Sequence, residues 1–150
     1  MKKNFSEITA LVVGDLMLDA YVYDKKNRKS PEADVPIVLE ENIKYFAGGS
    51  GNVVNNIKAL GANVIPVGVL GDDSQAEKLI KIFHNSEIKT DNIIKSKNLD
   101  TTIKKRIFIK NEQFVRVDRD MENINSEIHK KIFINVQKNI EFCDIIILSD

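Results

Sequence analysis

The sequence has few of the residues that form covalent cross-links or transition-metal sites. Its 150 residues include one cysteine, Cys143, and two histidines, His84 and His129. A single cysteine excludes an intrachain disulfide, and two histidines far apart in the sequence give no pattern of metal ligands. The apolar residues around Cys143 favour a small buried side chain over a reactive thiol. We therefore expect no metal site in this chain.

The chain also lacks an excess of charge of either sign and any long apolar run. It has 22 basic and 22 acidic residues, so nothing in the net charge points to nucleic acid or a membrane surface as a partner. No apolar run approaches the length that spans a membrane, and the first residues do not form a signal peptide. We expect a cytoplasmic protein, with one folded domain or part of one.

The most informative stretch that is present is Ala-Gly-Gly-Ser-Gly-Asn at residues 47–52. Its glycines allow positive φ angles and close approach of a ligand to the backbone. The apolar residues at 53, 54, 57 and 60 have the spacing of one helical face, and Gly61 stands where a helix ends. The stretch predicts a loop that opens a helix, whose free N–H groups suit hydroxyls and anions.

The order of strand and helix signals predicts an α/β fold. Residues 8–13 form an apolar run typical of a buried parallel strand, with Asp15 at its carboxyl end, and residues 63–70 give another strand. A helix capped by Asp73 or Ser74 follows, then a helix over 126–142 and a final strand over 143–150.

Two segments, about 21–41 and 101–118, depart from this order and indicate a β-flap over the core. The first contains strand signals at 21–23 and 35–39, and the second resembles a hairpin with a turn at 111–112. Alternation places Lys104, Arg106 and Arg116 on hairpin faces that could coincide. These cations could bind a phosphate or carboxylate, or could simply lie on a solvated surface.

Common nucleotide and hydrolase motifs do not fit the chain. The glycine loop lacks the third glycine of a dinucleotide-binding turn and the Gly-Lys-Ser/Thr of a P-loop, and no Gly-x-Ser-x-Gly elbow occurs. The loop is therefore better suited to a small molecule other than a nucleotide.

Several segments together resemble the ribokinase-like (PfkB) carbohydrate kinases. The Gly-Asp-x-Met-Leu-Asp and Ser-Pro-Glu-Ala-x-Val-Pro sequences narrow the likeness to the heptose 7-phosphate kinases within that family. The matching segments are Val13–Asp19, Ser30–Pro36, Gly48–Val53, Leu60–Ala62, Val69–Asp73 and Leu148–Asp150.

The resemblance implies the N-terminal portion of a three-layer sandwich with a small β-lid. It implies ATP- and Mg²⁺-dependent phosphorylation of D-glycero-D-manno-heptose 7-phosphate at its anomeric hydroxyl, which leads to ADP-heptose and lipopolysaccharide. By the same resemblance the lid would join two subunits into a homodimer. Asp15, Gly48, Gly49 and Asn52 would bind the sugar, and the candidates for its 7-phosphate would be Lys104, Arg106 and Arg116.

The family's second signature, Gly-Ala-Gly-Asp with the general-base aspartate, does not occur in residues 1–150. We therefore expect the catalytic base and most of the ATP and Mg²⁺ site to lie beyond Asp150, and the chain to be inactive alone. Two alternatives remain: a ribokinase-like kinase for another sugar or a nucleoside, and a non-catalytic sugar-phosphate-binding or dimerisation module.

Overall fold

Two four-stranded β-sheets, one two-stranded sheet and three α-helices make up the fold, which we describe from a computed structural model for residues 4–24 and 28–150. A parallel sheet in the order β10-β1-β6-β7 forms the core, and a second sheet in the order β5-β2-β8-β9 forms the lid. The core strands are β1 (Thr9–Gly14), β6 (Asn63–Gly71), β7 (Ile93–Ser96) and β10 (Ile145–Ser149). The lid strands are β2 (Leu16–Asp24), β5 (Ile43–Gly49), β8 (Ile103–Ile109) and β9 (Glu112–Arg119). The helices are α1 (Ser50–Ala59), α2 (Ser74–Asn85) and α3 (Ser126–Asn139), with 3₁₀ turns η1 (Phe5–Glu7) and η2 (Ile140–Phe142).

Helices cover both faces of the core sheet. The consecutive residues Val69 and Leu70 of β6 point to opposite faces, since side chains alternate along a strand. Leu70 belongs to the cluster that includes Val54 of α1 and Phe83 of α2, whereas Val69 packs with Ile128 of α3. The core is therefore a three-layer arrangement, as the resemblance predicts, and it confirms the α/β fold that the sequence pattern predicts.

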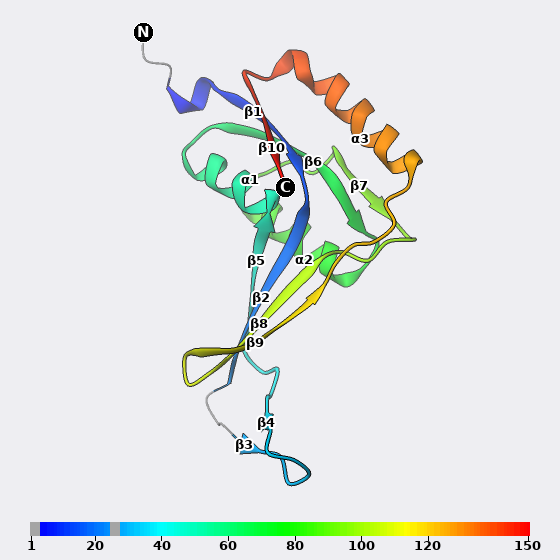
Figure 1. Ribbon diagram of the computed structural model, residues 1–150. Coiled ribbons are helices and arrows are strands. Elements are labelled where there is room, and N and C mark those ends of the chain that lie inside the picture. The colour runs from blue at the N-terminus through cyan, green and yellow to red at the C-terminus, as the bar shows by residue number, and fades with distance from the viewer. Residues whose placement is uncertain (1–3, 25–27) are drawn as a thin grey trace.

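The lid sheet extends away from the core, and a short arm lies at its far end (Figure 1). This arm consists of β3 (Arg28–Lys29) paired with β4 (Pro36–Ile37). Along β2, buried side chains alternate with half-buried ones. The buried set begins with Leu16 and Leu18, which join the cluster that contains α2, and the other set forms the open face of the lid.

The core elements β1, α1, β6, α2, α3 and β10 agree with the sequence predictions, but the core strand β7 was not predicted and the boundaries of the first lid segment differ. β2 already begins at Leu16, and β5 at Ile43–Gly49 was not predicted at all. The predicted strand over 35–39 is wrong, because only Pro36–Ile37 pair, and residues 25–27 of the first lid segment lie outside the described residues. The turn of the hairpin lies at Lys110 and Asn111, which both have positive φ.

Cys143 is half-buried and not fully buried, and its Sγ lies 3.2 Å from the carbonyl oxygen of Ile140. In the ranges 4–24 and 28–150, no helix has the length and apolar content that crossing a bilayer needs.

Candidate functional site

The glycine-rich segment 47–52 and the start of the lid meet at one junction. Asp15 is the one residue between β1 and β2, and Gly49 ends β5 directly before α1. The N–H of Ser50 donates to the carbonyl oxygen of Asp15 at 2.9 Å. Gly49 has φ 54°, and a Cβ there would collide with that same carbonyl oxygen, so the position requires glycine.

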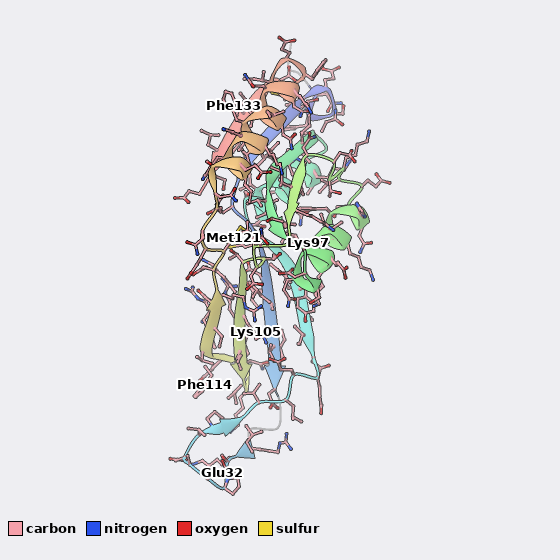
Figure 2. The ribbon with its side chains drawn as sticks, turned by 90° about the vertical axis from the view of Figure 1, so that its right-hand side faces the viewer. Glu32, Lys97, Lys105, Phe114, Met121 and Phe133 are labelled. Atoms are coloured by element: carbon pink, nitrogen blue, oxygen red, sulfur yellow. The ribbon has the colours of Figure 1, made fainter. Side chains whose placement is uncertain are left out.

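A cavity of about 220 Å³ lies at this junction, between the core sheet and the base of the lid. Its polar lining comes from Asp15, Thr102, Lys104 and Asp120, which combine two carboxylates, a hydroxyl and an ammonium group. The apolar lining residues are Leu16, Met17, Val69, Met121 and Ile124. Met121 lies where core and lid meet, while Lys105 lies further along the lid (Figure 2). Such a lining suits a small polar molecule with an apolar edge.

Next to this cavity, Asp19 of β2 is enclosed by the glycine-rich segment and by β8. Its Oδ1 accepts a hydrogen bond of 2.6 Å from Nη1 of Arg106, and the two side chains are 19% and 21% exposed. A Cβ on Gly48 would lie 2.8 Å from the Oδ2 of Asp19, so the carboxylate rests against this segment. The hydrogen bond to Asp19 raises the pKa of Arg106, although partial burial acts in the opposite direction. The guanidinium of Arg106 also lies over the ring of Tyr21.

The predicted hairpin faces do coincide, but carboxylates stand among the cations. Lys104 pairs across the strands with Asp118, and Arg106 pairs with Arg116. Arg116 forms an ion pair of 3.0 Å with Asp118. Lys104 lines the cavity, and within the described residues no ion pair involves it. Of the three predicted cations, Lys104 is thus the one placed to meet a ligand in the cavity.

Hydrogen bonds fix the base of the lid to the core. The Oδ2 of Asp73 accepts from the N–H of Thr101 at 2.8 Å, and the Thr101 hydroxyl accepts from the N–H of Gly71 at 2.9 Å. The Thr102 hydroxyl accepts from the N–H of Met121 at 2.9 Å. These bonds hold the strand β8 and the connection after β9 at the edge of the cavity.

The structure brings some of the predicted site residues together and leaves others at the margin. Asp15 and Lys104 line the cavity, and Gly48 and Gly49 lie beside it as the last residues of β5. The predicted loop over residues 47–52 is wrong, because β5 runs directly into α1 with no loop residue between them. Asn52 lies exposed on the first turn of α1, outside the lining. The site residues predicted from the sequence include neither Asp19 nor Asp120. The alternation of β2 could have placed Asp19 on the open face, but no local signal marks Asp120.

Comparison with known proteins identifies the family of this chain. The sequence model of the pfkB family carbohydrate kinases matches residues 8–149, which is nearly the whole chain. The chain belongs to this family. Among its relatives, bifunctional protein HldE of Aliarcobacter butzleri is 41% identical and that of Helicobacter acinonychis 40% identical, each over 93% of this chain. The chain spans 30% of the length of each of these two relatives.

Solved structures of sugar kinases share the fold. A carbohydrate kinase from Agrobacterium tumefaciens superposes with a TM-score of 0.71 at 14% identity. The superposition covers 94% of this chain and 45% of the kinase. Arabidopsis thaliana ribokinase complexed with ribose and ATP gives 0.67 at 17% identity, with the same coverage. At these identities the likeness establishes a ribokinase-like fold.

Proposed function

We propose that this chain forms the acceptor-binding part of a kinase that phosphorylates D-glycero-D-manno-heptose 7-phosphate at its anomeric hydroxyl. The product would be the 1,7-bisphosphate, a precursor of ADP-heptose and of lipopolysaccharide. The observation that supports this most is the junction cavity, where Asp15 and Lys104 offer a carboxylate and a cation to one ligand. A sugar phosphate has both the hydroxyls and the anionic group that these side chains bind.

The heptose itself is supported by sequence. The Gly-Asp-x-Met-Leu-Asp and Ser-Pro-Glu-Ala-x-Val-Pro segments resemble heptose 7-phosphate kinases, and the relatives named HldE are 40–41% identical over 93% of the chain. Both lines favour this acceptor over a pentose or a nucleoside.

In the proposed complex, the sugar lies at the junction with its hydroxyls toward Asp15, Asp19 and the amides of Gly48 and Gly49. Asn52 reaches the ligand from the first turn of α1. The 7-phosphate lies toward Lys104, with the ion-paired guanidinium groups of Arg106 and Arg116 behind it. Because each ion pair with a carboxylate has no net charge, these guanidinium groups attract a phosphate less than free arginines would, so Lys104 has the leading role.

The contribution of this chain to catalysis would be to orient the acceptor and to keep it in a partly enclosed cavity. ATP supplies the phosphoryl group when bound, and Mg²⁺ neutralises its charge. Across the described ranges, no group of three or more His, Cys, Asp or Glu side chains could hold a metal ion, so we assign no Mg²⁺ ligand to them.

We further propose that the general base and the nucleotide site come from polypeptide beyond Asp150. The length of the HldE relatives and the exposed edge of the core sheet support this. At that edge, Ile145, Ile146 and Leu148 of β10 are exposed, and Leu148 shows 79% of its surface. An additional strand or helix would cover this apolar surface.

A coupled ATPase assay on the complete protein, with a panel of sugars, tests the proposed function. We expect turnover with D-glycero-D-manno-heptose 7-phosphate and a bisphosphate product by mass spectrometry. Ribose, fructose 6-phosphate and adenosine should give rates at least about 100-fold lower, the size that a site built for hydroxyls and phosphate can achieve. Faster turnover of another panel member would reassign the acceptor, and tight sugar-phosphate binding without turnover would favour a non-catalytic module.

The open face of the lid supports a second proposal, that two copies pair through it. Tyr21 stacks on Phe108 at 5.9 Å and meets Phe46 edge-on at 5.4 Å, and Tyr23 stacks on Phe108 at 5.1 Å. Phe46 is 50% exposed. An aromatic surface of this kind is typical of a protein interface.

A further inference from the structure

We propose that Asp120 is a second carboxylate that binds hydroxyls of the acceptor, separate from the residues that bind its phosphate. This inference rests on the proposed function and adds a specificity residue to the same site. Asp120 follows the last residue of β9 and lines the junction cavity together with Asp15 and Lys104.

The order of the lid strands sets the spacing of the strands next to which the two carboxylates lie. Asp15 directly precedes β2, Lys104 lies on β8, and Asp120 directly follows β9. These strands are consecutive neighbours in the sheet, with β8 in the middle. Two interstrand spacings amount to about 10 Å. A sugar ring fits in that space, with hydroxyls toward a carboxylate on either side and Lys104 between them.

The backbone around Asp120 is fixed, which a binding residue needs. The next residue, Met121, donates its N–H to the Thr102 hydroxyl at 2.9 Å. Met121 and Ile124 pack against the buried cluster of Val69 and Ile128. Within the part of the chain that the structure describes, the Asp120 carboxylate has no hydrogen bond or ion pair. The Asp120 side chain is exposed to solvent and lines the cavity, so the carboxylate can accept hydrogen bonds from a ligand in place of water.

The charge of Asp120 decides which part of the ligand it contacts. An ionised carboxylate accepts hydrogen bonds and repels a phosphate dianion. Lys104 attracts the phosphate and donates to it. The two side chains therefore divide the ligand: Asp120 contacts the polyol, and Lys104 contacts the phosphate.

Isothermal titration of the complete protein with heptose 7-phosphate and with the unphosphorylated heptose separates these roles. Asp120→Ala should weaken binding of both sugars by about 10- to 100-fold, the range for a hydrogen bond to a charged group. Lys104→Ala should weaken only the phosphorylated sugar. The matched control is Glu122→Ala, an exposed acidic residue two positions away that is not part of the cavity lining, and it should bind both sugars as wild type does.

Asp120→Asn keeps the shape of the side chain and guards against a folding defect, which thermal unfolding of each variant would also detect. The inference is overturned if both Asp120 variants bind as wild type does, or if they lose affinity for the phosphorylated sugar alone. If the wild type binds another sugar phosphate instead, the proposed acceptor is wrong and the same variants are compared on that sugar. Absence of any sugar binding by the wild type would overturn both proposals.

Discussion

Among single residues of the site, Gly49 has the most constrained backbone. Its φ of 54° and the carbonyl oxygen of Asp15 leave no place for a side chain. We predict that Gly49→Ala lowers the free energy of unfolding by about 2–6 kcal/mol, from about 1–3 kcal/mol of backbone strain and a similar cost of overpacking. Urea denaturation monitored by circular dichroism measures this loss.

Gly61 provides the matched control for that substitution. It also has positive φ, 89°, but a Cβ there would meet no atom within 4 Å. Gly61→Ala should therefore cost only the backbone strain, about 1–2 kcal/mol. Equal losses at the two positions would show that the contact with Asp15 has no effect on stability.

At the scale of elements, Asp73 joins α2 to the base of the lid. Its Oδ1 caps α2 by accepting from the N–H groups of Gln75 and Ala76, while its Oδ2 accepts from Thr101. Burial opposes ionisation of Asp73, but the hydrogen bonds from Thr101, Ala76 and Gln75 outweigh it, and its pKa lies below the ordinary value. A lowered pKa in the folded state means that the ionised carboxylate stabilises the fold.

We predict that Asp73→Asn is less stable than wild type by about 1–2 kcal/mol at pH 7. Both oxygens of Asp73 accept from backbone N–H groups, and in asparagine an NH₂ group, which cannot accept, replaces one of them. The contribution of Asp73 is present above its unfolded-state pKa of about 3.9 and is lost as the pH falls through the lower folded-state pKa. The difference between the two proteins should therefore narrow below about pH 4. Urea unfolding of both proteins from about pH 3 to 7 measures this difference in stability.

Asp72→Asn is the control for this prediction, since the Asp72 side chain is exposed and caps no helix. Its stability should stay within about 0.5 kcal/mol of wild type. A constant difference between wild type and Asp73→Asn across the whole pH range would contradict the account given for Asp73.

The elements that sequence predicted are those whose signals are local. The apolar run of β1 and the cap of α2 at Asp73, one of the two residues predicted for it, each lie within a few neighbouring residues, and both are confirmed. By contrast, the ion pair of Asp19 with Arg106 joins residues 87 positions apart. It depends on the parallel register of β2 and β8, which no local pattern determines.

At the scale of the whole molecule, the open face of the lid predicts the oligomeric state. We expect a dimer in sedimentation velocity, and we expect Phe46→Glu to give monomers, because the new charge would be buried against the partner's aromatic surface. A shift of the dissociation constant by at least about 100-fold would fit a central aromatic contact.

Phe133→Glu is the control, because Phe133 is also an exposed phenylalanine, 61% accessible, but lies on α3 at the end of the molecule away from the lid (Figure 2). It should leave the dimer intact. A monomeric wild type, or a Phe46→Glu protein that remains dimeric, would refute pairing through this face.

The single residue between β1 and β2 has a further consequence. Asp15 donates its N–H to Ser149 at 3.3 Å and accepts from Ser50 at 2.9 Å, so its backbone is bonded on both sides. This connection is therefore short and bonded to the core, unlike a flexible hinge loop. A movement of the lid toward the core would bend β2 near this residue. Amide exchange along β2 should accordingly slow in graded fashion when the cavity is filled, with the largest change beside Asp15.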